Sequence, residues 1–232
     1  MTKEEFRKIS LEKLHRTSRE KYIKNSHAVA QNLEKTLKNL RFRTIALYLP
    51  IKTEANVRQI FPKLRRNKTI YVPFMECVSF KLVKYRLPVW KKKFNILEPA
   101  DSWRLRQKVD VIVIPVIGVD GDLRRVGFGK GMYDRFFAAL KPKPFTIFVQ
   151  LAKCFTQKRL CEAYDIQADV YITPTDTIIR RGKNVYRDRN RGGLCRSYGS
   201  NRFCNSKKTG FGKSRDIYRA SQSARQSDRT RS

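Results

Sequence analysis

Apolar residues recur with helical spacing in several parts of the chain. Across residues 3–40 they fall at three- to five-residue steps, which predicts helix in two consecutive pieces. Residues 54–64 show similar spacing, but Pro62 should kink or end that helix because proline lacks a backbone N–H. A further helix is predicted over residues 132–140.

Short apolar runs of strand length lie between these helical segments, and residues 86–108 are predicted to be irregular. The predicted strands are Thr44–Leu49, Thr69–Val72, Phe80–Tyr85, Val109–Val116, Phe145–Val149 and Ala168–Thr173. Because strands alternate with helices, we predict an α/β protein with a mostly parallel open sheet and helices on both faces, in a Rossmann-like three-layer arrangement. Ligands of such sheets bind beyond the carboxyl ends of the strands, where the loop after Val116 begins.

The chain changes character near its C-terminal end. We expect one α/β domain over residues 1–176 and a basic tail over 177–232, disordered from about residue 180 because Gly, Ser, Arg and Asn dominate it. Such a composition cannot bury enough apolar surface to offset the entropy of ordering. The tail has two possible origins: a nucleic-acid-binding arm with interleaved aromatic residues, or an extension without a selected role.

The charge balance favours anionic partners. The 232 residues include 52 Lys+Arg and 20 Asp+Glu, a formal net charge of +32. This excess suits nucleotides, polyanionic cofactors, nucleic acid or acidic lipid without choosing among them. The cysteines form no C-x-x-C pair and the two histidines have no partners at metal-site spacing, so these residues predict no metal site. We expect the cysteines to be reduced thiols in a cytoplasmic protein. No secretory signal or membrane span is predicted, and hence no membrane partner.

A glycine-rich loop follows the predicted strand 109–116. It ends in Gly127-Phe128-Gly129-Lys130-Gly131, and Tyr133-Asp134-Arg135 opens the next helix. Glycines allow backbone N–H groups to approach a ligand closely, and a helix N-terminus with a lysine adds positive charge, so the pattern favours a phosphate site. The glycines taken alone favour a simple tight strand-to-helix turn, and the charged and aromatic residues beside them favour the phosphate site. The loop matches neither the P-loop nor the dinucleotide fingerprint.

The segment Arg125-Val126-Gly127-Phe128-Gly129-Lys130-Gly131-Met132-Tyr133-Asp134 resembles the signature of the 5-formyltetrahydrofolate cyclo-ligase family, also called methenyltetrahydrofolate synthetases. The similarity covers residues 3–176, and Lys3, Arg7, Glu54 and Asp165 also fall in family order.

The resemblance implies conversion of 5-formyltetrahydrofolate to 5,10-methenyltetrahydrofolate with ATP and Mg²⁺, through a phosphorylated formyl intermediate. The catalytic residues it implies are Lys130, Tyr133 and Arg125. The ATP-binding residues it implies are Lys3, Arg7, Gly127, Phe128, Gly129, Lys130, Gly131, Met132, Tyr133 and Asp134. Glu54 and Tyr133 would bind the folate, and Asp134 and Asp165 would hold the metal ion.

Spacing alone gives several of these residues simpler roles. Lys3 and Arg7 lie four apart and would share one solvated face of a helix. Glu54 would serve as a carboxylate in the first turn of a helix, and Asp165 as a turn residue.

The chain departs from the family pattern at several positions. Phe128 stands where some members carry a basic residue, Met132 replaces an aromatic residue, and Tyr164 replaces a histidine. Leu123 stands where glycine is usual, two residues before Arg125. These changes affect individual contacts rather than the reaction class.

Two rival functions use the same features differently. The main rival is a nucleic-acid-binding module with little or no catalysis, acting through the basic surface and tail. Another is an ATP-dependent kinase or ligase acting on a different anionic substrate. The set Lys130, Tyr133, Asp134 and Asp165 favours the cyclo-ligase, because a pure binding module would not need it. We expect a monomer whose folate substrate can carry a polyglutamate tail, with nucleic acid bound only through residues 177–232.

Overall fold

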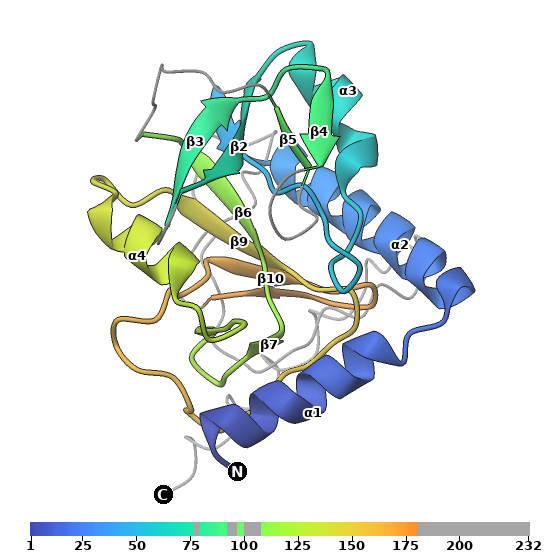
Figure 1. Ribbon diagram of the computed structural model, residues 1–232, viewed down its shortest axis with the longest axis vertical. Coiled ribbons are helices and arrows are strands. Elements are labelled where there is room, and N and C mark those ends of the chain that lie inside the picture. The colour runs from blue at the N-terminus through green and yellow to red at the C-terminus, as the bar shows by residue number, and fades with distance from the viewer. Residues whose placement is uncertain (77–78, 92–96, 100–107, 181–232) are drawn as a thin grey trace, which may run out of the picture.

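The computed structural model describes residues 1–76, 79–91, 97–99 and 108–180 (Figure 1). The expected disordered tail therefore lies outside the described residues, except for its first four positions.

A seven-stranded sheet forms the centre of the protein, in the order β11-β10-β9-β6-β1-β2-β3. Its strands are β1 (Thr44–Ala46), β2 (Thr69–Met75), β3 (Phe80–Lys84), β6 (Val111–Pro115), β9 (Phe145–Val149), β10 (Val170–Ile172) and β11 (Thr177–Ile179). The strands from β10 to β2 are parallel, whereas β3 and β11 pair antiparallel at the two edges. The prediction of a mostly parallel open sheet is therefore confirmed.

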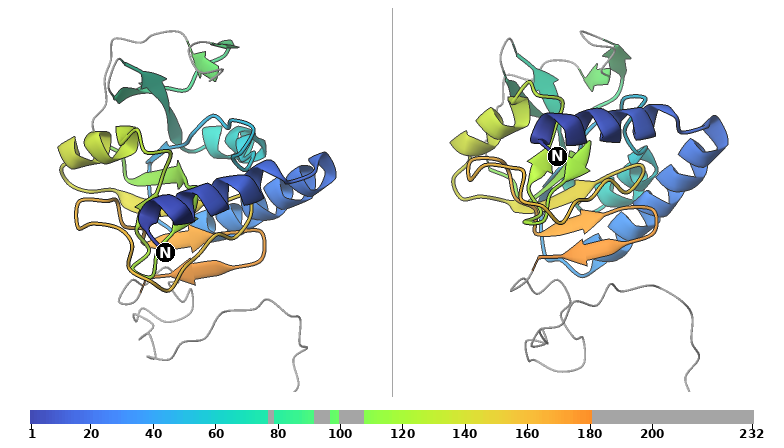
Figure 2. Two further views of the ribbon diagram at one scale, coloured as in Figure 1. Left: turned by 60° about the horizontal axis from the view of Figure 1, so that its bottom comes forward. Right: turned by 90° about the horizontal axis from the view of Figure 1, so that it is seen from below.

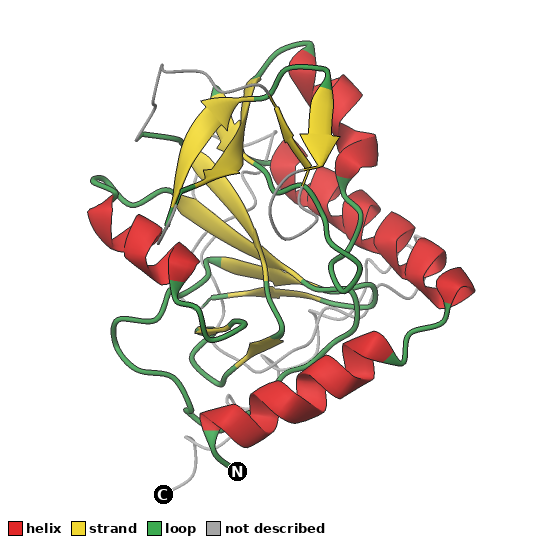
Figure 3. Cartoon of the chain, viewed as in Figure 1, coloured by secondary structure: helices red, strands yellow, loops and turns green. Residues whose placement is uncertain are grey.

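Helices cover both faces of this sheet, as predicted (Figure 3). In β6, Val111 and Val113 pack with α2 (Arg19–Lys38) and α3 (Phe61–Arg65), whereas the alternate residues pack with α4 (Met132–Ala139). This alternation follows from the two-residue repeat of a strand, and it gives each face its own apolar core. Among the described residues, no helix combines the length and the apolar character that crossing a bilayer requires.

The N-terminal helical region divides where the sequence predicts it to divide. Helix α1 (Lys3–His15) begins with a capping box, in which Thr2 accepts from the Glu5 N–H and Glu5 accepts from the Thr2 N–H. Ser18 caps α2 in a similar way by accepting from the Lys21 N–H. Both caps satisfy N–H groups that have no partner within the helix, which fixes the break between the two helices.

The structure differs from the predicted elements in three places. Residues 54–64 form a 3-10 turn, η1 (Arg58–Ile60), and then α3, with Pro62 in the first turn of α3, because proline suits a helix start. The region predicted to be irregular contains a hairpin of β4 (Val89–Lys91) and β5 (Leu97–Pro99). Strand β11 continues the sheet just past the boundary predicted at residue 176.

A second hairpin, β7 (Gly118–Val119) with β8 (Arg125–Val126), links β6 to the glycine-rich loop. A methyl-sized Cβ at Gly118 would lie 2.4 Å from a ring atom of Phe6, so only glycine lets α1 pack this closely. Figure 2 shows α1 crossing this hairpin. The packing brings the N-terminal helix to the loop that follows β8.

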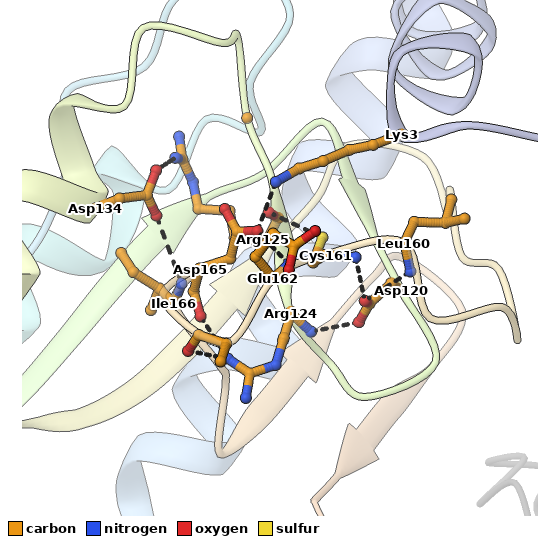
Figure 4. A network of polar contacts seen from close by, with 12 residues as sticks. Lys3, Asp120, Arg124, Arg125, Asp134, Leu160, Cys161, Glu162, Asp165 and Ile166 are labelled. Atoms are coloured by element: carbon orange, nitrogen blue, oxygen red, sulfur yellow. Dashed lines mark hydrogen bonds and ion pairs between the residues drawn. The ribbon is translucent and has the colours of Figure 1, made fainter.

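One buried carboxylate fixes the turn of this hairpin. Asp120 Oδ1 accepts from the N–H groups of Asp122 (3.0 Å) and Arg124 (2.8 Å). Its Oδ2 accepts from the N–H groups of Leu160 (3.2 Å) and Cys161 (3.0 Å), as Figure 4 shows. The side chain thus ties the turn before β8 to a segment 40 residues away.

We expect Asp120→Ala to destabilise the fold strongly, because it leaves several buried N–H groups without an acceptor. The expected loss is about 3 kcal/mol of unfolding free energy, since each unpaired buried donor costs about 1–3 kcal/mol. Urea denaturation measures it. Asp122→Ala is the matched control: that carboxylate pairs with exposed Arg159 at 3.2 Å, and such surface pairs contribute little. Equal losses in the two variants would contradict the role given to Asp120.

Candidate active site

The glycine-rich loop turns sharply into α4. Gly129 and Gly131 have φ values of 88° and 59°, the left-handed region that side chains other than glycine rarely adopt. Gly131 is also the N-cap of α4, with no side chain to bond its first N–H groups. The loop is therefore a tight strand-to-helix turn, and it leaves those N–H groups at the helix start for a ligand.

The shared face of α1 brings one cation to this loop and the other to Asp165. Arg7 Nε donates to the Gly127 carbonyl at 2.8 Å, and Lys3 Nζ pairs with Asp165 Oδ2 at 2.5 Å. Burial is the largest single effect and lowers the pKa of Lys3, but the hydrogen bond to Asp165 and the charges of nearby groups together outweigh it, and the pKa is raised overall. Lys3 and Arg7 thus contact site residues rather than forming a purely solvated face.

Arg125 is a buried cation at the centre of the site. Its Nη1 lies 3.5 Å from Asp134 Oδ2, and its guanidinium carbon lies 4.8 Å from the centre of the Tyr133 ring. A Cβ at Gly127 would lie 2.5 Å from Nη1, so glycine is needed there to admit the guanidinium. The buried Arg125 Nε has no hydrogen-bond partner in the described structure, which leaves a donor for a ligand.

An apolar cavity of about 380 Å³ opens between the loop and the sheet. Its lining includes Glu54, Met75, Phe80, Phe128, Lys130 and Tyr133. Tyr133 is held by an edge-to-face contact with Phe80, with the ring centres 4.8 Å apart. The cavity is large enough for a small organic ligand. Its few polar groups come from two segments that are distant in the sequence, Glu54 from one and Arg125, Lys130 and Tyr133 from the other.

The polar groups of this cavity influence each other's ionisation. Burial raises the pKa of Glu54 to about 7, although the Ile51 N–H and the charge of Arg125 both favour the carboxylate. Burial and the nearby Glu54 also raise the pKa of Tyr133, against the opposing effect of Arg125. Tyr133 therefore remains a neutral phenol near pH 7 and acts as a hydrogen-bond donor rather than a base.

A larger, more polar cavity of about 630 Å³ lies on the other side of Asp134. Asp134, Asp165 and Arg124 line it, together with Lys143 and Arg180. Figure 4 shows Asp134 and Asp165 in one network of polar contacts. The Ile166 N–H points at Asp134 Oδ1 at 3.5 Å, so the two acidic segments are adjacent.

The predicted metal ligands form a sparse donor set. Among the described residues, no group of three or more His, Cys, Asp or Glu side chains could enclose a metal ion. Mg²⁺ usually keeps several waters and is held by one or two carboxylates together with substrate phosphates. Asp134 and Asp165 therefore fit a magnesium ion that shares phosphate oxygens, but not a dedicated metal cage.

Three supporting residues were not predicted from the sequence. Besides Asp120, Arg124 Nη1 donates to the carbonyls of Ala163 (2.8 Å) and Asp165 (2.7 Å), which fixes the segment carrying Asp165. Leu123, where the family usually has glycine, has a left-handed backbone with φ 59°. Asp120 directly follows β7, but that strand was not predicted, and nothing in the sequence indicates the role of Arg124.

Comparison with known proteins gives the family of the chain. The model of the 5-formyltetrahydrofolate cyclo-ligase family matches residues 1–162. The chain belongs to this family. It is therefore an enzyme of the ligase class, and the family and its neighbours indicate 5-formyltetrahydrofolate cyclo-ligase activity.

Individual members of the cyclo-ligase family are moderately similar to the chain. A 5-formyltetrahydrofolate cyclo-ligase of Mycoplasma pneumoniae is 29% identical over 134 residues, covering 56% of this chain and 72% of the relative. The solved structure of Aquifex aeolicus 5,10-methenyltetrahydrofolate synthetase aligns with a TM-score of 0.68 at 28% identity, covering 83% of this chain and 100% of that one. A 5,10-methenyltetrahydrofolate synthetase structure from Mycoplasma pneumoniae gives a TM-score of 0.58 at 27% identity, covering 75% and 99%.

The raised pKa of Glu54 predicts a pH-dependent effect on stability. The pKa of Glu54 is about 7 in the folded protein and 4.5 for an ordinary carboxyl. Burial of Glu54 therefore carries no ionisation penalty below about pH 4.5, and the free energy of unfolding decreases as the pH rises from there through 7. Glu54→Gln cannot ionise, so we expect it to raise Tm at pH 8 and to change it much less at pH 5.

Differential scanning fluorimetry at both pH values measures this effect. Glu12→Gln, an exposed carboxyl on α1, is the control and should change Tm little at either pH. If Glu54→Gln shifts Tm equally at both pH values, burial does not raise the pKa of Glu54 as described.

Proposed function

We propose that the protein converts 5-formyltetrahydrofolate to 5,10-methenyltetrahydrofolate with ATP and Mg²⁺, through a phosphorylated formyl intermediate. The observation that carries this proposal is that residues adjacent in the chain line the two cavities. Arg125 and Tyr133 line the apolar cavity, and the neighbouring Asp134 lines the polar one. A folate in the apolar cavity and a triphosphate on the glycine-rich loop, whose Lys130 and Gly131 line the same cavity, would meet at Arg125 and Tyr133.

The apolar cavity suits the pterin of the substrate. A pterin has a flat ring that Met75 and Phe80 can cover, and its amino and ring N–H groups need an acceptor. Glu54 supplies that acceptor when it is ionised. Tyr133, as a neutral phenol, can donate a hydrogen bond to the formyl oxygen.

The glycine-rich loop suits the phosphates of ATP. The backbone N–H groups at the start of α4 and the charge of Lys130 would bind the transferring phosphoryl group. Lys3, Arg7 and Arg125 add positive charge around the same loop. Gly127, Phe128, Gly129, Gly131 and Met132 complete the expected nucleotide-binding segment.

The proposed reaction has two steps. The formyl oxygen first attacks the γ-phosphorus, so that an O–P bond forms and the bond to the leaving ADP breaks. Nitrogen N10 then attacks the formyl carbon, the C–O bond breaks to release phosphate, and N10 loses its proton. Phosphoryl transfer asks mainly for positioning and charge neutralisation, which a set of fixed cations supplies. Mg²⁺, held by Asp134 and Asp165 when bound, would supply additional positive charge to the phosphates.

Several features of the substrate and the protein remain expectations. Basic residues around the cavities suit a polyglutamylated folate, and we expect a monomeric, cytoplasmic enzyme. Nucleic-acid binding would involve the tail, which lies almost wholly outside the described residues.

The direct test is the absorbance of the methenyl product in a mixture of protein, 5-formyltetrahydrofolate, ATP and Mg²⁺. We expect a rise in absorbance that is lost when any one component is omitted. No rise with protein that is folded and binds ATP would point to another phosphoryl acceptor. No rise together with no ATP binding would refute the enzymatic proposal.

Lys130→Ala should lower turnover by about 10²–10³-fold, the usual effect of removing one group that stabilises developing charge. The fold should remain intact, because Lys130 is exposed. Steady-state kinetics and circular dichroism measure the two properties. Lys24→Ala is the matched control, since it removes an exposed lysine from α2 on the opposite face of the sheet. Near-normal turnover in Lys130→Ala would exclude the phosphate role.

A further inference from the structure

Each expected metal ligand already has a cation of the protein beside it. Asp165 Oδ2 lies 2.5 Å from Lys3 Nζ, and Asp134 Oδ2 lies 3.5 Å from Arg125 Nη1. Without bound ligands the two carboxylates are thus neutralised internally. A divalent cation that binds them must first displace or share these partners.

The contact of Lys3 is the closer one, and it occupies one of the two carboxylate oxygens with which Asp165 would bind a cation. Asp165 Oδ2 accepts from Lys3 and also from the Glu162 N–H at 2.7 Å. Asp165 is buried, and Arg124 fixes its backbone by donating to its carbonyl at 2.7 Å. Because the carboxylate cannot easily turn away, its oxygen becomes available only when the Lys3 side chain moves.

Lys3 is able to move without undocking α1. Its side chain is 25% exposed and lies in the first turn of the helix. Phe6 packs on Gly118, and Arg7 bonds the Gly127 carbonyl, so the rest of the helix is held independently. Rotation of one long side chain would carry its ammonium group from Asp165 toward the loop.

We propose that Lys3 is a positioning residue that keeps Asp165 from binding a divalent cation until anionic phosphates draw the lysine away. The blocking of Asp165 follows from the contacts above, whereas the identity of the phosphate donor as ATP rests on the proposed function. An ammonium group next to the carboxylate repels a second cation, and phosphate oxygens offer the ammonium group a new partner. The free protein therefore binds divalent metal weakly, and metal and nucleotide bind together.

The test measures Mn²⁺ binding to the nucleotide-free protein by electron paramagnetic resonance. Lys3→Met removes the charge and should tighten Mn²⁺ binding by at least about tenfold, the effect of losing one nearby like charge at a dielectric close to that of water. Lys3→Arg keeps a cation and should bind as weakly as the unmodified protein. Lys8→Met, which removes an exposed lysine from the same helix, controls for net charge and should change nothing.

A second neutral variant guards against misfolding. Lys3→Gln can still donate a hydrogen bond to Asp165, so it should tighten Mn²⁺ binding even where Lys3→Met unfolds. Adding Asp165→Asn to either neutral variant should abolish the gain. Unchanged affinity in the folded neutral variants, a gain in Lys8→Met, or a gain that survives Asp165→Asn would overturn the proposal. Neither ATP nor folate is present, so the result does not depend on whether the protein has cyclo-ligase activity.

Discussion

The burial of Arg125 is the constraint on which the arrangement of the site depends. A buried guanidinium needs compensation, and it finds a carboxylate in Asp134, a ring face in Tyr133 and space above Gly127. These partners come from the loop and from the first turn of α4, so the need to compensate the buried charge of Arg125 fixes the path of the loop. The loop is thereby held against the apolar cavity, where the groups suited to a folate and to phosphates lie on the same wall.

The sequence predicted the layers of the fold better than its edges. Strands such as 145–149 were predicted correctly because a buried parallel strand is apolar on both faces. Strand β11 was missed because Thr177–Ile179 is too short to show a pattern and depends on pairing with β10. Pro62 was expected to end a helix but begins α3, because proline is compatible with both positions and tertiary packing decides between them. The disorder expected for residues 181–232 is untested.

The candidate site was predicted by resemblance more than by physics. Spacing placed Lys3 and Arg7 on one helical face, but only the fold shows that this face meets the glycine-rich loop. The role of Asp120 depends on N–H groups from residues 160 and 161, which are distant in sequence and therefore invisible to local patterns. Leu123, where the family usually has glycine, adopts a left-handed backbone that glycine would adopt without strain, and the local pattern did not indicate this. The roles of the ATP, folate and metal residues remain predictions.

The ion pair between Lys3 and Asp165 joins positions 162 residues apart. Bringing together such distant parts of a chain is entropically costly, so contacts of this kind tend to form late in folding. Helix α1 is attached by a few apolar side chains, chiefly Phe6 and Leu14, and by a few polar contacts, and such an element can open locally while the sheet stays intact. Mild heat or denaturant should therefore abolish catalytic activity before the sheet unfolds. Activity would then report the docking of α1 more sensitively than spectroscopic probes of secondary structure do.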